Sequence, residues 1–180
     1  MAQQAEQHYQ NMNNYQGYLD ALNDEVAAQM NLKAIYADNI EQLKAQRDQV
    51  TKYSDDWYTL TEAIYSAEEA ISDINNTIEQ ISSKKVTITQ TKQSNEQAPL
   101  THQGAMYEKI ATRYQSLGQF ENYAAVMSSR IQQYDVDIAL AKAEMEEWSD
   151  LMAELSASGE EGSEAWVNAR TQYWTLVENE

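Results

Sequence analysis

Cysteine is absent from this chain of 180 residues, proline occurs once and glycine five times. Without cysteine the protein forms no disulfides and performs no thiolate chemistry, and cysteine usage indicates no redox compartment. The scarcity of proline and glycine removes most of the turns that sheets and short-loop folds require. A hydrophobic content of 42% is enough for a buried core, so we expect a folded chain built mainly of long helices.

Long apolar runs and basic clusters are also missing. The longest apolar stretch, about five residues at 123–127, is far shorter than the roughly 20 residues that a bilayer-spanning helix needs. The first 14 residues lack a basic region followed by an apolar one, so we expect no Sec-type signal. With 12 basic and 29 acidic residues the net charge is -17, and the nearest thing to a basic stripe is the pair Lys84 and Lys85. We therefore expect a soluble protein with no nucleic acid binding and no membrane span. The sequence does not identify its location, for which the cytoplasm and a virion are the alternatives.

Apolar residues recur in alternating steps of three and four, the spacing of a helix seam in a coiled coil. The most regular series has no polar member and comprises Trp57, Leu60, Ile64, Ala67, Ile71, Ile74, Ile78 and Ile81. A looser series from Met12 to Val50 is interrupted by the polar residues Gln29, Lys33 and Arg47. A third series comprises Ala124, Met127, Ile131, Tyr134, Ile138, Ala141, Met145, Trp148, Met152 and Leu155. Together they predict long helices packed lengthwise at shallow angles.

Breaks in these series divide the chain into five predicted helices, over about residues 5–52, 55–84, 104–117, 120–157 and 163–178. Ser54 is a good N-cap, although 50–56 fits either a tight turn or a phase slip within one helix. Residues 85–103 change to β-branched and then to polar residues before Pro99, which we interpret as an extended connector, either a mobile loop or a contact tip. The predicted fold is all-α: a single elongated domain over 1–180, formed by a long antiparallel helical hairpin or coiled-coil bundle of three to five helices.

No pattern of a catalytic, metal or cofactor site is present. Helical bundles hold di-iron centres through Glu-x-x-His pairs, but Ala5 and Pro99 stand three residues before His8 and His102. The glycines are scattered and none precedes Lys-Ser or Lys-Thr, so nucleotide binding has no support. We expect a protein that is not an enzyme and that uses no cofactor and no metal.

Charge and aromatic content favour contacts with other proteins. Residues 135–164 hold ten acidic side chains and one basic one, Lys142, a local charge of 1 - 10 = -9. A solvated helix face explains this charge, and so does docking onto a basic partner. Twelve tyrosines and four tryptophans against one phenylalanine are a composition typical of interfaces. The candidate interface residues are Trp148, Trp166, Tyr173, Trp174, Glu144, Glu147, Asp150 and Glu154.

The sequence therefore favours a non-catalytic helical structural subunit that packs against copies of itself or other proteins in a larger assembly, such as a virion, a phage particle or a similar scaffold. The polar seam positions fit a helix that completes its packing against another copy, or one that is half exposed to water. The alternative is an acidic helical binding module, an adaptor, chaperone or exported effector that captures a basic partner.

Overall fold

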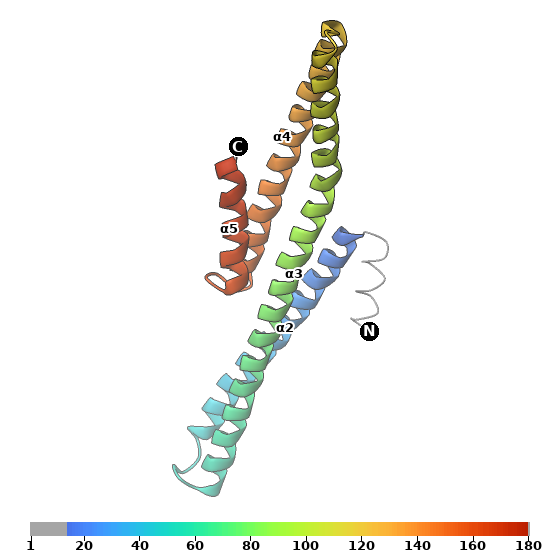
Figure 1. Cartoon of the computed structure of the whole chain (residues 1–180). Coiled ribbons are helices and arrows are strands. Elements are labelled where there is room, and N and C mark those ends of the chain that lie inside the picture. The colour runs from blue at the N-terminus through green and yellow to red at the C-terminus, as the bar shows by residue number, and fades with distance from the viewer. Residues whose placement is uncertain (1–13, 180) are drawn as a thin grey trace. The chain divides into compact units, whose positions relative to one another are not determined.

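The computed structural model describes residues 14–179, which form four helices and no strand. They are α2 (Tyr15–Arg47), α3 (Asp55–Ser116), α4 (Phe120–Ala157) and α5 (Glu164–Asn179) (Figure 1). The predicted all-α class is confirmed. Packing groups the chain into two compact units: the first takes α2, α3 up to Lys85 and the residues Ser158–Ser163, and the second takes the rest. That the chain is a single domain stays a prediction.

In the first unit, α2 and the beginning of α3 form an antiparallel hairpin. The Asn14 side chain caps α2 by accepting a hydrogen bond from Gly17 N at 3.0 Å. The chain leaves the helix after Arg47 and turns through residues 48–54, where Tyr53 takes a φ of 66°. Ser54 Oγ then accepts from Trp57 N at 3.2 Å and starts α3. Residues 50–56 therefore contain a turn, which the sequence had left undecided.

The core of this hairpin comes from the most regular apolar series. Ile64 and Ala67 of α3 are buried with Ile40 of α2, and the half-buried side chains of Tyr36, Leu43 and Ile71 pack around them. The polar seam residues Gln29, Lys33 and Arg47 are half-buried. The Arg47 guanidinium lies 5.8 Å from the centre of the Trp57 ring, and this cation–π contact stabilises the positive charge at a seam position.

In the second unit, the remainder of α3 pairs with α4, and α5 packs against α4 (Figure 1). The core is formed by Val86, Trp148, Leu151, Leu155, Ala165 and Ala169. The turn before α4 contains Gly118 at a φ of 68°. The turn before α5, which is grouped with the first unit, contains Gly159 and Gly162 at 84° and 83°. These positive angles favour glycine, and they end the helices where the sequence placed breaks. Helices α4 and α5 occupy nearly the residues predicted for them.

The prediction of an extended connector at 85–103 was wrong. Helix α3 runs without a break from Asp55 to Ser116, with Pro99 inside it, and Gly104 is an interior residue rather than the start of a new helix. Burial decides the conformation here, because Val86, Thr89 and Gln93 are all buried at helical spacing. Local β propensity is a weak preference that such packing overrides.

The first predicted helix also differs from the structure. It was expected over 5–52, whereas α2 spans Tyr15–Arg47. Residues 5–13 of that prediction lie outside the described residues. The earlier end follows from the turn at 48–54, which brings α3 back along α2.

Candidate functional site

A layer of polar side chains lies between α3 and α4 in the second unit. Trp148 is only 1% exposed, and its Nε1 donates to Gln93 Oε1 at 2.8 Å. The Gln93 amide in turn donates to Glu147 Oε2 at 3.2 Å, and Lys92 forms an ion pair with Glu147. Because a buried polar group without a partner costs about 1–3 kcal/mol, this layer favours one register of α3 against α4.

Glu144 is the most deeply buried charged residue of this layer, with 1% exposure. Gln97 Nε2 donates to its Oε2 at 2.7 Å, whereas its Oε1 has no hydrogen-bond partner among the described residues. Burial raises the pKa of Glu144, and the nearby carboxylates of Glu96 and Glu147 raise it further, against the opposing effects of Gln97 and Lys92. The chain thus keeps a carboxyl group where its charge is unfavourable.

Arg130 continues the polar layer toward the start of α4. Its guanidinium lies against Gly104, where an added Cβ would come within 2.8 Å of Nη1. It pairs with Asp137 Oδ2 at 3.4 Å and Glu108 Oε1 at 3.7 Å, and it lies 4.0 Å from the centre of the Tyr134 ring. The glycine in α3 therefore makes room for a largely buried arginine from α4.

Large apolar side chains lie on the outside of the same stretch of α4. Ile131, Tyr134 and Ile138 are 60%, 48% and 46% exposed, and we refer to them as the outer stripe. Within the same stretch of α4 the buried residue is Gln133, whose side-chain amide donates to the Leu100 carbonyl of α3. The apolar series predicted for α4 thus points outward here, because the polar layer occupies the face toward α3.

Farther along α4 the same apolar series turns inward and is covered by α5. Trp148 and Leu155 belong to the core that α5 completes with its two buried alanines. Leu176, near the end of α5, lines the same cavity as Ala141 of α4. The end of α5 therefore lies near Ala141, which follows Ile138, the last residue of the outer stripe, in the apolar series of α4.

The candidate interface residues occupy three environments. Trp148 and Glu144 are inside the second unit, and Glu147 is half-buried beside Lys92. Trp166 and Tyr173 are half-buried against the core of the same unit, and Trp166 Nε1 donates to Ser156 Oγ at 3.1 Å. Packing within the chain explains the position of these five residues.

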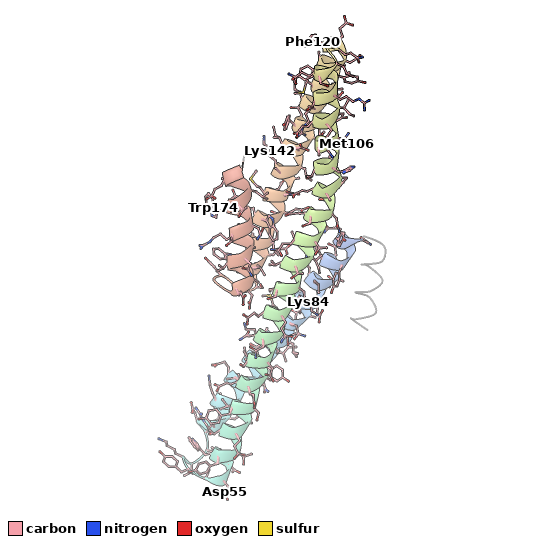
Figure 2. The ribbon with its side chains drawn as sticks, viewed as in Figure 1. Asp55, Lys84, Met106, Phe120, Lys142 and Trp174 are labelled. Atoms are coloured by element: carbon pink, nitrogen blue, oxygen red, sulfur yellow. The ribbon has the colours of Figure 1, made fainter. Side chains whose placement is uncertain are left out.

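The other three candidate residues lie at the surface. Trp174 is 54% exposed, meets Tyr173 edge-on at 5.5 Å between ring centres, and lies on the side of α5 away from α4 (Figure 2). Asp150 and Glu154 take exposed positions on α4, and Glu146 precedes them with the same spacing of four. These acidic residues therefore share one solvated side of α4. Contact between this surface and a partner stays a prediction.

Residues 14–179 contain no candidate metal site and no candidate membrane span. Nowhere in this range do three or more His, Cys, Asp or Glu side chains gather in a way that could hold a metal ion. None of the described helices combines the length and the apolar character needed to cross a bilayer. The second unit thus combines a polar layer between α3 and α4 with the exposed apolar outer stripe on α4.

Searches against family models, curated proteins and solved structures return no match to this chain.

Residues of the polar layer that the sequence did not single out include Gln93, Gln97 and Arg130. A signal for the two glutamines exists in the spacing along α3, where alternating steps of four and three continue through Val86, Gln90, Gln93, Gln97, Leu100 and Gly104. A seam traced by spacing alone, without requiring apolar members, would have identified the inward face of this helix.

Proposed function

We propose that this protein is a non-catalytic helical structural subunit that acts by packing against other protein chains in a larger assembly, such as a virion, a phage particle or a similar scaffold. The observation that carries the proposal is the outer stripe of α4. Three large apolar side chains stand at the spacing of a coiled-coil seam on the exposed side of a helix. Contiguous exposed apolar surface of this kind marks protein interaction sites.

A second copy of this chain is the occupant that we propose for the outer stripe. Steps of three and four are the spacing at which two like helices interlock, so a stripe on one copy is complementary to the same stripe on another. The stripe also continues the face of α4 that α5 covers, and a helix laid on Ile131 and Ile138 would extend packing that the chain already uses.

Further exposed apolar residues lie at the turn between α3 and α4 and on the end of α3. Leu117 and Phe120 flank the turn and are 59% and 70% exposed, and Figure 2 shows Phe120 at this end of α4. Met106 and Ile110 of α3 are also exposed. Because a chain with a net charge of -17 repels its copies, association requires apolar burial and strengthens when salt screens the repulsion.

Light scattering coupled to size-exclusion chromatography tests this proposal. The full chain is measured at low and high salt over about a hundredfold range of concentration. We expect a defined oligomer that persists at high salt, since apolar contacts survive the screening that weakens ion pairs. A monomer at every concentration in both salts would contradict self-association.

The acidic binding module remains the second proposal, and the exposed acidic side of α4 favours it. Glu146, Asp150 and Glu154 lie one above another at a spacing of four, beyond the reach of the polar layer. A peptide of alternating lysine and alanine is the probe, with binding measured by calorimetry. Binding that weakens at high salt and in the variant Glu146→Gln, Asp150→Asn, Glu154→Gln supports the module, and binding insensitive to both contradicts it.

A further inference from the structure

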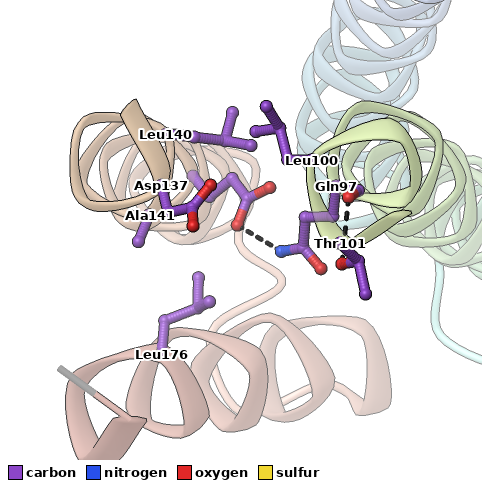
Figure 3. Close-up of a pocket in the computed structure, with 8 residues that line it drawn as sticks. Gln97, Leu100, Thr101, Asp137, Leu140, Ala141 and Leu176 are labelled. Atoms are coloured by element: carbon purple, nitrogen blue, oxygen red, sulfur yellow. Dashed lines mark hydrogen bonds between the residues drawn. The ribbon is translucent and has the colours of Figure 1, made fainter. Parts of the chain in front are cut away.

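A cavity of about 230 Å³ lies in the second unit, where α3, α4 and α5 meet (Figure 3). Gln97, Leu100 and Thr101 reach it from α3, and Leu176 reaches it from α5. Helix α4 contributes Asp137, Leu140, Ala141 and Glu144. Its volume is below the roughly 300–1,000 Å³ of pockets for drug-sized ligands, so it suits a smaller group. We refer to it as the Glu144 cavity.

Two carboxylate oxygens of the Glu144 cavity are buried without a hydrogen-bond partner among the described residues. They are Oε1 of Glu144 and Oδ1 of Asp137, while the other oxygen of each group accepts a hydrogen bond from Gln97 and Arg130 respectively. Both acids line the cavity, and its lining contains no basic residue. Two buried acceptors therefore face a space that offers no donor of opposite charge.

The remaining walls restrict what can enter. Leu100, Leu140, Ala141 and Leu176 are apolar and suit methylene groups, whereas a metal ion would need more acidic ligands than the two that line the cavity. An anion would be repelled by both carboxylates. A group that combines N–H donors, positive charge and an alkyl chain satisfies the acceptors and the walls together.

We infer that the Glu144 cavity binds an ammonium group carried on a short alkyl chain, with Glu144 Oε1 as its principal acceptor and Asp137 Oδ1 as a second. Such a group is available from a free aliphatic amine or from a lysine side chain of a partner protein. Both sources present the same chemistry to the cavity. This inference does not depend on self-association through the outer stripe, because the two sites use different residues.

Binding in the Glu144 cavity should depend on pH in one direction. An ammonium group prefers the ionised carboxylate, and burial raises the pKa of Glu144, so affinity should fall as acidification protonates this residue. The charged groups that act on it are Glu96 and Lys92 from α3 and Glu147 from α4, while α5 contributes the uncharged Leu176 to the cavity. The amine itself keeps its charge throughout, because alkylammonium groups resemble lysine, with a pKa of about 10.4.

Isothermal titration calorimetry of the full chain with 1,4-diaminobutane and with capped lysine tests the inference. 1-Butanol and capped norleucine have similar chains without the charge and should not bind. We expect one site, with affinity reduced about tenfold or more by Glu144→Gln, since a charge-assisted hydrogen bond is lost. Glu146→Gln removes the same charge from an exposed position outside the cavity and should change affinity less than about twofold.

A second variant separates loss of binding from loss of fold. Ala141→Leu leaves every charge in place but fills part of the cavity, so it should also abolish binding while circular dichroism shows an intact helical chain. Specific binding of capped lysine alone assigns the site to a protein side chain, and binding of diaminobutane assigns it to free amines. Absence of binding by both, or equal weakening by Glu144→Gln and Glu146→Gln, would overturn the inference.

Discussion

Trp148 and Gln93 are joined by a hydrogen bond of 2.8 Å from the indole Nε1 to the amide Oε1, and both side chains are buried although they stand 55 residues apart in the chain. This contact fixes α4 against the part of α3 that the sequence had assigned to a connector. It also explains why a tryptophan in an apolar series needs a polar partner on the facing helix.

Replacement of Trp148 by phenylalanine tests this contact. Trp148→Phe retains an aromatic ring but leaves Gln93 Oε1 without its donor, so we expect a loss of about 1–3 kcal/mol in the free energy of unfolding. Urea denaturation followed by circular dichroism gives the value. Trp174→Phe is the matched control, because Trp174 is exposed and its replacement should change stability by about 0.5 kcal/mol or less. Equal effects of the two substitutions would contradict the buried hydrogen bond.

Continuity of α3 through Pro99 gives a second prediction. Proline in a helix interior lacks an N–H donor and is less favourable than alanine by about 3 kcal/mol, so Pro99→Ala should stabilise the chain by about 1–3 kcal/mol. Ala98→Gly, at the neighbouring exposed position, should destabilise it by about 1 kcal/mol. Both values come from urea denaturation. An extended connector would instead leave stability almost unchanged in both variants.

Glu144 gives a prediction for the pH dependence of stability. Its pKa in the folded chain is raised above the ordinary value of 4.5, so the folded state binds more protons than the unfolded state between these two values. Its contribution to stability is therefore greatest at low pH and is lost as the pH rises through the raised pKa. Relative to the parent chain, Glu144→Gln should gain stability as the pH increases from 4 to 7.

Thermal melting of the two proteins across this pH range measures the effect. Glu146→Gln, which removes the same charge at an exposed position, provides the control for the overall negative charge. The difference in melting temperature between Glu144→Gln and the parent should increase with pH. A difference that is constant over the range, or that decreases, would contradict a raised pKa.

The fold could be predicted wherever the inward face of a helix is apolar. Ile64, Ala67 and their neighbours identified the inward face of α3 in the first hairpin, although the turn at 48–54 was left undecided, and the glycines at 118, 159 and 162 located the ends of α4 and the start of α5. Prediction failed at 85–103 because the inward face becomes polar, with Gln93 buried and Gln97 hydrogen-bonded to Glu144. A search for apolar residues at helical spacing therefore finds nothing in this stretch. Pro99 and the β-branched residues instead favoured an extended conformation, which was wrong.

The candidate site was predicted less completely for a related reason. The tryptophans and acids of α4 and α5 were identified by residue type, which does not distinguish the buried Glu144 from the exposed Glu154. The residues of the outer stripe were recognised as part of a helix seam. Whether this seam faces α3 or solvent depends on which other residues of α4 pack against α3. That direction is set by pairs such as Gln133 with the Leu100 carbonyl, which link distant parts of the chain. Spacing along one helix does not contain this information.

Sedimentation velocity on two variants tests the central claim most directly. Ile131→Ser combined with Ile138→Ser removes the two ends of the outer stripe, whereas Val136→Ser alters an equally exposed apolar residue on another side of α4. We expect the parent chain and Val136→Ser to sediment as the same oligomer and the double variant to sediment as a folded monomer, with helicity checked by circular dichroism. A double variant that associates as strongly as the parent, or a parent that is monomeric throughout, would contradict a subunit that assembles through this stripe.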